Sequence, residues 1–177
     1  GACCAPLPQG TDLRSHVERY ATPDALRLFL VSFSNHDRFD FARTWAGQLC
    51  TLGLPHFSVG ALDAKALAVA RAEGIPAFAM GDHGLGGEDY GWNSPRFKLM
   101  GQDKVQLLLD VLALNATAVV TDADAVFVAN PLPFFQRHAE ADVLVLTDFT
   151  GFGAMDGGLE EVNVAGHVMN IGVIYAR

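Results

Sequence analysis

The chain has 177 residues, of which 50% are hydrophobic and 18% charged, and its formal net charge at pH 7 is −8. This length and composition are typical of one globular domain with a packed core, which excludes an intrinsically disordered protein. The acidic balance and the lack of a lysine- or arginine-rich run argue against nucleic acid as the main partner. No stretch approaches the roughly 20 apolar residues that cross a bilayer.

The start of the chain predicts a linker followed by a domain. Residues 1–23 contain several prolines and show no clear apolar periodicity, so we expect a linker or stem there and a domain over residues 24–177. A nearly continuous apolar run over 26–33 predicts a buried parallel strand. Ser34 and Asn35 then begin a helix to about residue 52, with Asp37 completing a capping box. Cys50 lies on its apolar face and is expected to be a core residue.

Two further strand–helix units follow. The second strand is predicted over 57–62, with Asp63 capping a helix over 64–73, and the third strand over 75–80. After a glycine-rich loop, Ser94 caps a third helix that has Pro95 at its first position. This helix is expected to turn five apolar residues inward, namely Phe97, Val105, Leu108, Leu109 and Leu112.

The fourth strand, 118–121, runs directly into Asp122, and later strands are predicted over 142–147 and 168–175. Alternating strands and helices predict an α/β fold, Rossmann-like, with a mostly parallel sheet and helices on both faces. In such a sheet the ligand lies beyond the carboxyl ends of the strands. Because the chain stops on a core strand, we expect the domain to be C-terminally incomplete.

Asp122 and Asp124 are the strongest candidate site. Residues two apart on an extended backbone point to the same side, so both carboxylates can address one point in the ligand crevice. Carboxylate oxygens suit Mn²⁺ or Mg²⁺, which can bridge the phosphates of a nucleotide diphosphate. The structural alternative is a solvated turn capped by two aspartates.

Other polar residues at the same edge are candidates for binding a nucleotide. Lys104 or Lys98 on the third helix could reach a phosphate, or both could be solvated helix charges. Asp63 could bind the nucleoside or serve only as a helix cap. Phe33 or Asn35 could contact the base, although Phe33 could equally belong to the core.

Three further features are weighed outside this group. Asp148 follows a strand and could face the ligand beyond the strand ends. The six histidines lack metal-ligand spacing and are expected to be structural or solvated. Asn115-Ala116-Thr117 is a glycosylation triplet in a predicted surface turn, which makes Asn115 a candidate for an attached glycan.

Several runs of this sequence resemble one family. The run VVTDADAVFVANPLPFF, then ADVLVLTD, then MNIGVIYAR are similar to the nucleotide-diphospho-sugar transferase domain of plant and algal cell-wall enzymes, namely the extensin arabinosyltransferases and the rhamnogalacturonan xylosyltransferases. GWNSPRFKLMGQDKV and VGALD add to the resemblance, which covers residues 26–177.

The resemblance implies a GT-A fold and an enzyme that transfers a pentose or galactose from a UDP-sugar donor to a cell-wall glycan or glycoprotein acceptor, with retention and with Mn²⁺ or Mg²⁺. It implies a type II membrane protein of the Golgi lumen whose membrane anchor lies outside this chain. It assigns Asp122 and Asp124 to the metal, Asn170 and Gly172 to the vicinity of the donor sugar, and favours Lys104 over Lys98. A further metal ligand and the acceptor site are expected beyond the last strand.

Two other functions remain open from the residues. A strand followed by Asp-x-Asp also resembles the first motif of haloacid-dehalogenase-type phosphatases, in which Asp122 would be the nucleophile and Asp124 the general acid/base. The late position of the motif and the absence of a lysine after Lys104 argue against this alternative. A non-catalytic fragment that binds nucleotide-sugar is the third hypothesis.

Overall fold

The computed structural model describes residues 10, 12–81, 91, 94–147 and 169–177 of the chain. The described strands form one sheet, in the order β3-β2-β1-β4-β6-β5. Its members are β1 (Leu28–Ser34), β2 (Phe57–Ala61), β3 (Ala77–Ala79), β4 (Thr117–Thr121), β5 (Val143–Thr147) and β6 (Met169–Ala176).

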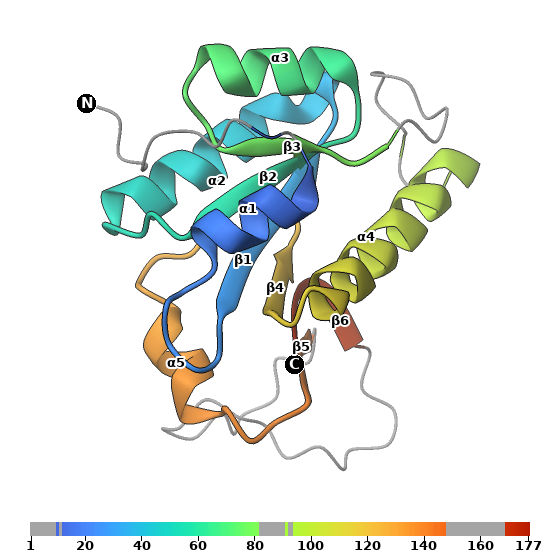
Figure 1. Ribbon diagram of the computed structural model, residues 1–177. Coiled ribbons are helices and arrows are strands. Elements are labelled where there is room, and N and C mark those ends of the chain that lie inside the picture. Colours follow the sequence, from blue (N-terminus) through green and yellow to red (C-terminus); the bar gives the residue numbers. More distant parts are fainter. Residues whose placement is uncertain (1–9, 11, 82–90, 92–93, 148–168) are drawn as a thin grey trace.

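The sheet is mostly parallel, as the sequence predicts. β1 pairs in parallel with β2 and with β4, and β2 pairs in parallel with β3, whereas β6 runs antiparallel to both β4 and β5. The chain builds outward from β1 to β3 and then returns to place β4 on the other side of β1 (Figure 1). The boundary between β1 and β4 is therefore the point where the strand order reverses.

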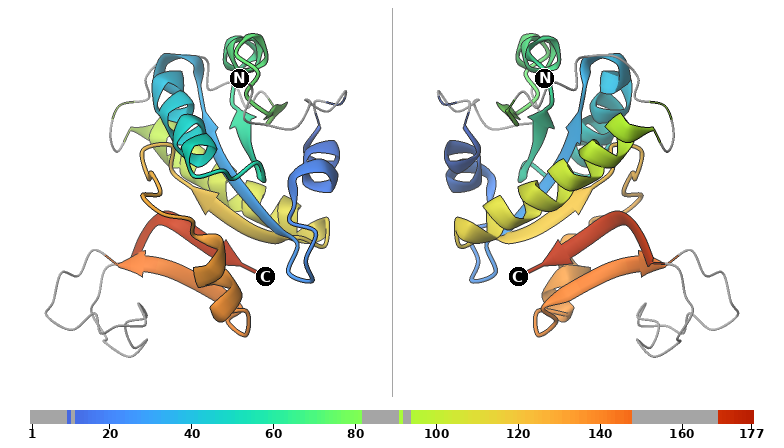
Figure 2. Two further views of the ribbon diagram at one scale, coloured as in Figure 1. Left: turned by 90° about the vertical axis from the view of Figure 1, so that its left-hand side faces the viewer. Right: turned by 90° about the vertical axis from the view of Figure 1, so that its right-hand side faces the viewer.

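Helices cover both faces of the sheet. The described helical segments are α1 (Leu13–Tyr20), the 3₁₀ turn η1 (His36–Arg38), α2 (Phe39–Thr51), α3 (Ala64–Ala72), α4 (Pro95–Ala113) and α5 (Leu132–Arg137). Residues of α2, α3 and α5 form one apolar cluster with the sheet, and residues of α1 and α4 form a second. The two clusters share no buried residue, and α1 and α2 lie on opposite sides of β1 and β2 (Figure 2).

The expectation of a linker over residues 1–23 is wrong for its second half. Asp12 caps α1 by accepting a hydrogen bond from the Ser15 backbone N–H at 3.0 Å. Val17 and Tyr20 on this helix are each 1% exposed and belong to the core. Leu13, Val17 and Tyr20 do recur at helical spacing, but the pattern is short and lies among prolines, so a search for long periodicity misses it.

The expected inner face of α4 is also partly wrong. Val105 and Leu109 are 52% and 51% exposed, whereas Leu107, Val111 and Lys104 are buried. Phe97 and Leu108 do pack partly against the core. Because residues 107–109 are all leucine, the spacing of apolar residues does not identify the buried face of α4. The face that is buried in the structure also carries Lys104, whose polar contact is described below.

Two smaller differences concern α2 and its surroundings. The segment begins as η1, whose cap is Asn35 accepting from the Arg38 N–H at 3.1 Å, and no Ser34–Asp37 capping box forms. Cys50 packs against the core as expected, and it also takes part in a disulfide bond. Among the described helices, none combines the length and the apolar character that a bilayer crossing requires.

Candidate functional site

The candidate site lies at the carboxyl ends of β1 and β4, where the strand order reverses. Ser34 ends β1 and Thr121 ends β4, and the two strands are in direct parallel register up to Ser32 and Thr121. β6 is antiparallel, so its first residues reach the same edge. Asn35 follows β1, Asp122 follows β4, and Asn170 to Gly172 begin β6. Four of the predicted site residues are therefore brought to one edge by the topology.

A buried lysine holds Asp122 at this edge. The Lys104 Nζ donates to Asp122 Oδ1 at 2.7 Å and also to the backbone carbonyl of Ile171. The Lys104 side chain is 3% exposed and that of Asp122 is 43% exposed. A buried ammonium is costly without a partner, so this ion pair joins α4, β4 and β6 around one carboxylate. The alternative of a solvated helix charge is therefore wrong for Lys104, and its contact with a phosphate stays a prediction.

Asp122 and Asp124 lie in a turn rather than on an extended strand. The Asp122 N–H donates to the Gly172 carbonyl at 2.7 Å, and the Ala125 N–H donates back to the Asp122 carbonyl at 3.1 Å. Strand alternation therefore does not describe how their carboxylates are arranged. Asp124 is exposed on this turn, and Asp122 is half-buried.

The donor set fits a hard divalent cation that completes its coordination with phosphate. Across the described ranges, no group of three or more aspartate, glutamate, histidine or cysteine side chains is placed to hold a metal ion. Mg²⁺-type sites at phosphates use one or two carboxylates together with substrate oxygens and water. Asp122, whose Oδ2 lies outside the lysine pair, and the exposed Asp124 supply the two carboxylates of such a donor set, and metal binding by them stays a prediction.

Asn170 and Gly172 are next to this carboxylate. The Gly172 N–H donates to Asn170 Oδ1 at 2.6 Å. A Cβ at position 172 would lie 2.8 Å from Asn170 Oδ1 and 3.7 Å from Asp122 Oδ2. Any side chain at position 172 would therefore require the Asn170 side chain to move.

Asp63 and Asn35 form a second group at the ends of β1 and β2, and both already have structural partners. Asp63 Oδ1 accepts from the Lys65 and Ala66 N–H groups at 2.8 and 2.9 Å, and Oδ2 accepts from the His36 N–H at 2.7 Å. Asn35 is 4% exposed and caps η1. The Asp63 carboxylate thus links the start of α3 to the loop after β1 through these hydrogen bonds. Nucleoside binding by either residue stays a prediction.

Phe33 lies in the core beside a close contact of two strands. It is 5% exposed. A Cβ on Gly60 would lie 2.2 Å from the Met80 sulfur and 3.3 Å from Phe33 Cβ, so the Met80 side chain packs directly against the backbone of Gly60 and would have to move if residue 60 carried a side chain. Contact between Phe33 and a base stays a prediction. The contact of Met80 with Gly60 could not be predicted from the sequence, because it joins residues 20 apart and depends on how β2 and β3 pack.

The remaining candidates lie apart or outside the described residues. Lys98 is exposed on α4. Asp148 and His83 fall outside the described residues. His16 is buried on α1, where its Nδ1 lies 2.6 Å from Ser58 Oγ, and His36 is exposed, so both agree with structural or solvated roles. Asn115 is exposed, but it precedes β4, whereas Asp122 follows β4, so the two residues lie at opposite ends of this strand.

Comparison with known proteins identifies relatives of this chain. A family model described as nucleotide-diphospho-sugar transferase matches residues 52–177. The arabinosyltransferase XEG113 of Arabidopsis thaliana is 36% identical over 150 residues, which cover 85% of this chain and 23% of that protein. The beta-arabinofuranosyltransferase RAY1 of the same plant is 27% identical over 145 residues, covering 81% and 27%.

The chain therefore spans about a quarter of the length of the curated relatives that it matches. No solved structure matches it. Residues 52–177, which the family model matches, contain every run that resembles the transferase domain, and this match disfavours the phosphatase hypothesis.

Proposed function

The chain belongs to the nucleotide-diphospho-sugar transferase family, and from this premise we propose that it forms the donor-binding part of a metal-assisted glycosyltransferase. The observation that carries the proposal is the Lys104–Asp122 pair at the strand-order reversal, next to the exposed Asp124. A nucleotide diphosphate is multiply charged, and a chain of net charge −8 needs local cations to accept it. Lys104 and a cation on the aspartate pair would supply them.

Each side chain has a separate part in this proposal. Asp122 and Asp124 would hold Mn²⁺ or Mg²⁺, which offsets charge that develops on the diphosphate as the sugar leaves. Among the described residues, the Lys104 Nζ donates to Asp122 and to the Ile171 carbonyl, and a third N–H donor would bind a phosphate oxygen. Asn170 and Gly172 would border the sugar, with Asn170 held by the Gly172 N–H.

The donor is proposed to be a UDP-sugar that carries a pentose or galactose. Both curated relatives carry names of arabinose transferases, so UDP-arabinose is the donor to test first. The acceptor is proposed to be a cell-wall glycan or glycoprotein. Retention of configuration remains part of the proposal, carried by the resemblance.

The proposed location is the Golgi lumen, as a type II membrane protein with an anchor outside this chain. The disulfide bond of Cys50 supports an oxidising compartment, because disulfides are rare in the cytosol.

Calorimetric titration of UDP with and without Mn²⁺ tests the proposed site. We expect binding that requires Mn²⁺ and that weakens by about 100-fold or more in Asp122→Asn and in Asp124→Asn, a loss of about 2.7 kcal/mol. Asp110→Asn changes an exposed carboxylate on α4 and should bind as the unaltered chain does. Unchanged binding in the two site variants, or tight binding without metal, would contradict the site.

Incubation with UDP-arabinose then separates a transferase from a binding fragment. Release of UDP that requires both Mn²⁺ and an acceptor supports transfer. Metal-dependent binding without release of UDP, under conditions in which the longer protein releases it, supports the non-catalytic alternative for this chain.

A further inference from the structure

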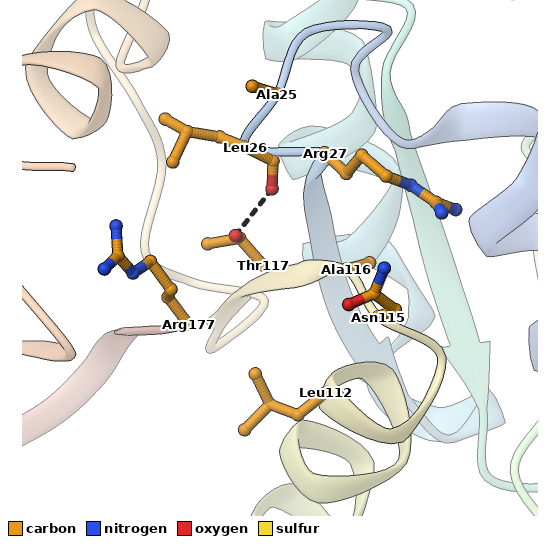
Figure 3. Close-up of a pocket in the computed structure, with 8 residues that line it drawn as sticks. All are labelled: Ala25, Leu26, Arg27, Leu112, Asn115, Ala116, Thr117 and Arg177. Carbon is orange, nitrogen blue, oxygen red and sulfur yellow. Dashed lines mark hydrogen bonds between the residues drawn. The ribbon is translucent and has the colours of Figure 1, made fainter.

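An open hollow of about 510 Å³ lies beside the amino-terminal ends of β1 and β4, at the opposite end of these strands from Asp122 and Asp124. Segments from the start of β1, the end of α4, the start of β4 and the end of β6 surround it (Figure 3). The residues that line it are Ala25, Leu26, Arg27, Leu112, Asn115, Ala116, Thr117 and Arg177. None of these residues contributes to the proposed donor site, so the hollow needs an explanation of its own.

The hollow contains all three residues of a glycosylation triplet. Asn115-Ala116-Thr117 has the Asn-x-Thr pattern with a middle residue other than proline, and it is the one such triplet in the sequence. Asn115 is exposed and follows the C-terminal end of α4 with a φ of 56°. An asparagine is one of the few residues besides glycine that adopts this conformation readily. The predicted surface turn is therefore confirmed for Asn115, whereas Ala116 and Thr117 are buried and Thr117 begins β4.

The threonine of the triplet is also accounted for in the folded chain. The Thr117 Oγ1 donates to the Leu26 carbonyl at 2.6 Å, and Thr117 is 5% exposed (Figure 3). Attachment of an N-linked glycan precedes completion of the fold, so this burial does not hide the hydroxyl when it is needed. Serine would serve both the triplet and the hydrogen bond, which allows the two roles to be tested together.

The surroundings of Asn115 can accommodate a carbohydrate. Leu112 offers an apolar contact, while the guanidinium groups of Arg27 and Arg177 can donate to hydroxyl and carbonyl oxygens. The hollow is open to solvent, so a branched glycan attached there can extend away from the protein. An oxidising compartment, which the Cys50 disulfide supports, is also where N-linked glycans are attached.

We propose that Asn115 carries an N-linked glycan at the end of β4 opposite to the proposed donor site. In the attachment step, the Asn115 amide nitrogen forms a bond to the anomeric carbon of a polyprenyl-diphosphate-linked oligosaccharide. The bond from that carbon to the diphosphate oxygen breaks, the polyprenyl diphosphate leaves with the bonding electrons, and the amide loses one proton. The oligosaccharide is thus the co-reactant, and no oxidant or reductant takes part.

The test is expression of the chain behind a cleavable secretion signal in eukaryotic cells, followed by digestion with a peptide N-glycosidase. We expect digestion to increase electrophoretic mobility and, in heavy-oxygen water, to convert residue 115 to a labelled aspartate in the peptide mass spectrum. Asn115→Gly should show no shift, and because glycine accepts a positive φ this variant preserves the turn. Thr117→Ser should still show the shift.

Two outcomes would overturn the proposal. One is an unaltered chain without a shift, secreted from cells that glycosylate a reporter protein in the same experiment. The other is a digestion shift that persists in Asn115→Gly.

Discussion

At the scale of single residues, Lys104 and Lys98 are a matched pair on α4. Lys104 is buried against Asp122, and Lys98 is exposed. We expect Lys104→Met to weaken Mn²⁺-dependent UDP binding by about tenfold or more, since it removes a cation that faces the diphosphate, which corresponds to about 1.4 kcal/mol. Lys98→Met should leave the affinity unchanged. Equal affinities in the two variants, measured by titration calorimetry, would remove Lys104 from the site.

The position of a candidate residue in the fold can be predicted from the sequence where it directly follows a strand. Asp122 and Asp124 follow the buried strand β4, so the topology alone places them at the carboxyl end of the sheet. The contact of Lys104 with the Ile171 carbonyl joins residues 67 apart in sequence and leaves no local pattern. The same holds for the second oxygen of Asp63, which accepts from the backbone of His36. Such contacts require the folded chain.

At the scale of elements, α1 makes the stability of the chain depend on pH through His16. Burial lowers the pKa of His16 from 6.5 to about 4, and its ring lies against Tyr20 and Phe78. Between these two values the unfolded chain binds a proton that the folded chain does not. The stabilising contribution is therefore complete above pH 6.5 and is lost as the pH falls toward 4.

We expect His16 to reduce the free energy of unfolding by about 2–3 kcal/mol between pH 6.5 and pH 4. His16→Asn, whose amide can replace Nδ1 opposite Ser58, should be less stable at pH 7 but should lose less stability across that range. Urea unfolding at several pH values measures both slopes. Parallel pH profiles for the two proteins would show that another group causes the dependence.

The elements themselves are predicted best where a cap or an apolar run marks them. Ser94 with Pro95 and Asp63 mark the true starts of α4 and α3. α1 is missed because the helix is only eight residues long, and its three apolar residues are too few to show a clear helical period. The rotation of α4 is missed for the opposite reason, since its many apolar residues are compatible with more than one buried face. Its observed face brings Lys104 to the carboxylate at the end of β4.

At the scale of the whole molecule, the alternating pattern predicts the parallel half of the sheet but not the direction of β6. Parallel strands joined by helices are restricted to right-handed crossovers, which limits the order of β1 to β4. The long segment between β5 and β6 carries no such restriction. Yet the antiparallel direction of β6 is what brings Asn170 and Gly172 next to Asp122. The proposed donor site therefore depends on the one strand whose direction the sequence leaves undecided.

Because the site joins α4, β4 and β6, its ligands should stabilise the entire domain. A ligand at 100 times its dissociation constant stabilises the folded state by about 2.7 kcal/mol, which raises Tm by roughly 5–10 °C in a domain of this size. We expect this rise with Mn²⁺ and UDP together, and little with either alone.

The two aspartate variants should differ in the same thermal experiment. Without ligand, Asp124→Asn changes an exposed side chain and should keep the Tm of the unaltered chain, with a free-energy change within about 0.5 kcal/mol. Asp122→Asn leaves the buried Lys104 ammonium without a carboxylate, so we expect a loss of about 1–3 kcal/mol and a lower Tm. With Mn²⁺ and UDP, neither variant should show the rise. A full rise in Asp124→Asn would mean that Asp122 alone carries the metal-dependent binding, and the pair would cease to be the site.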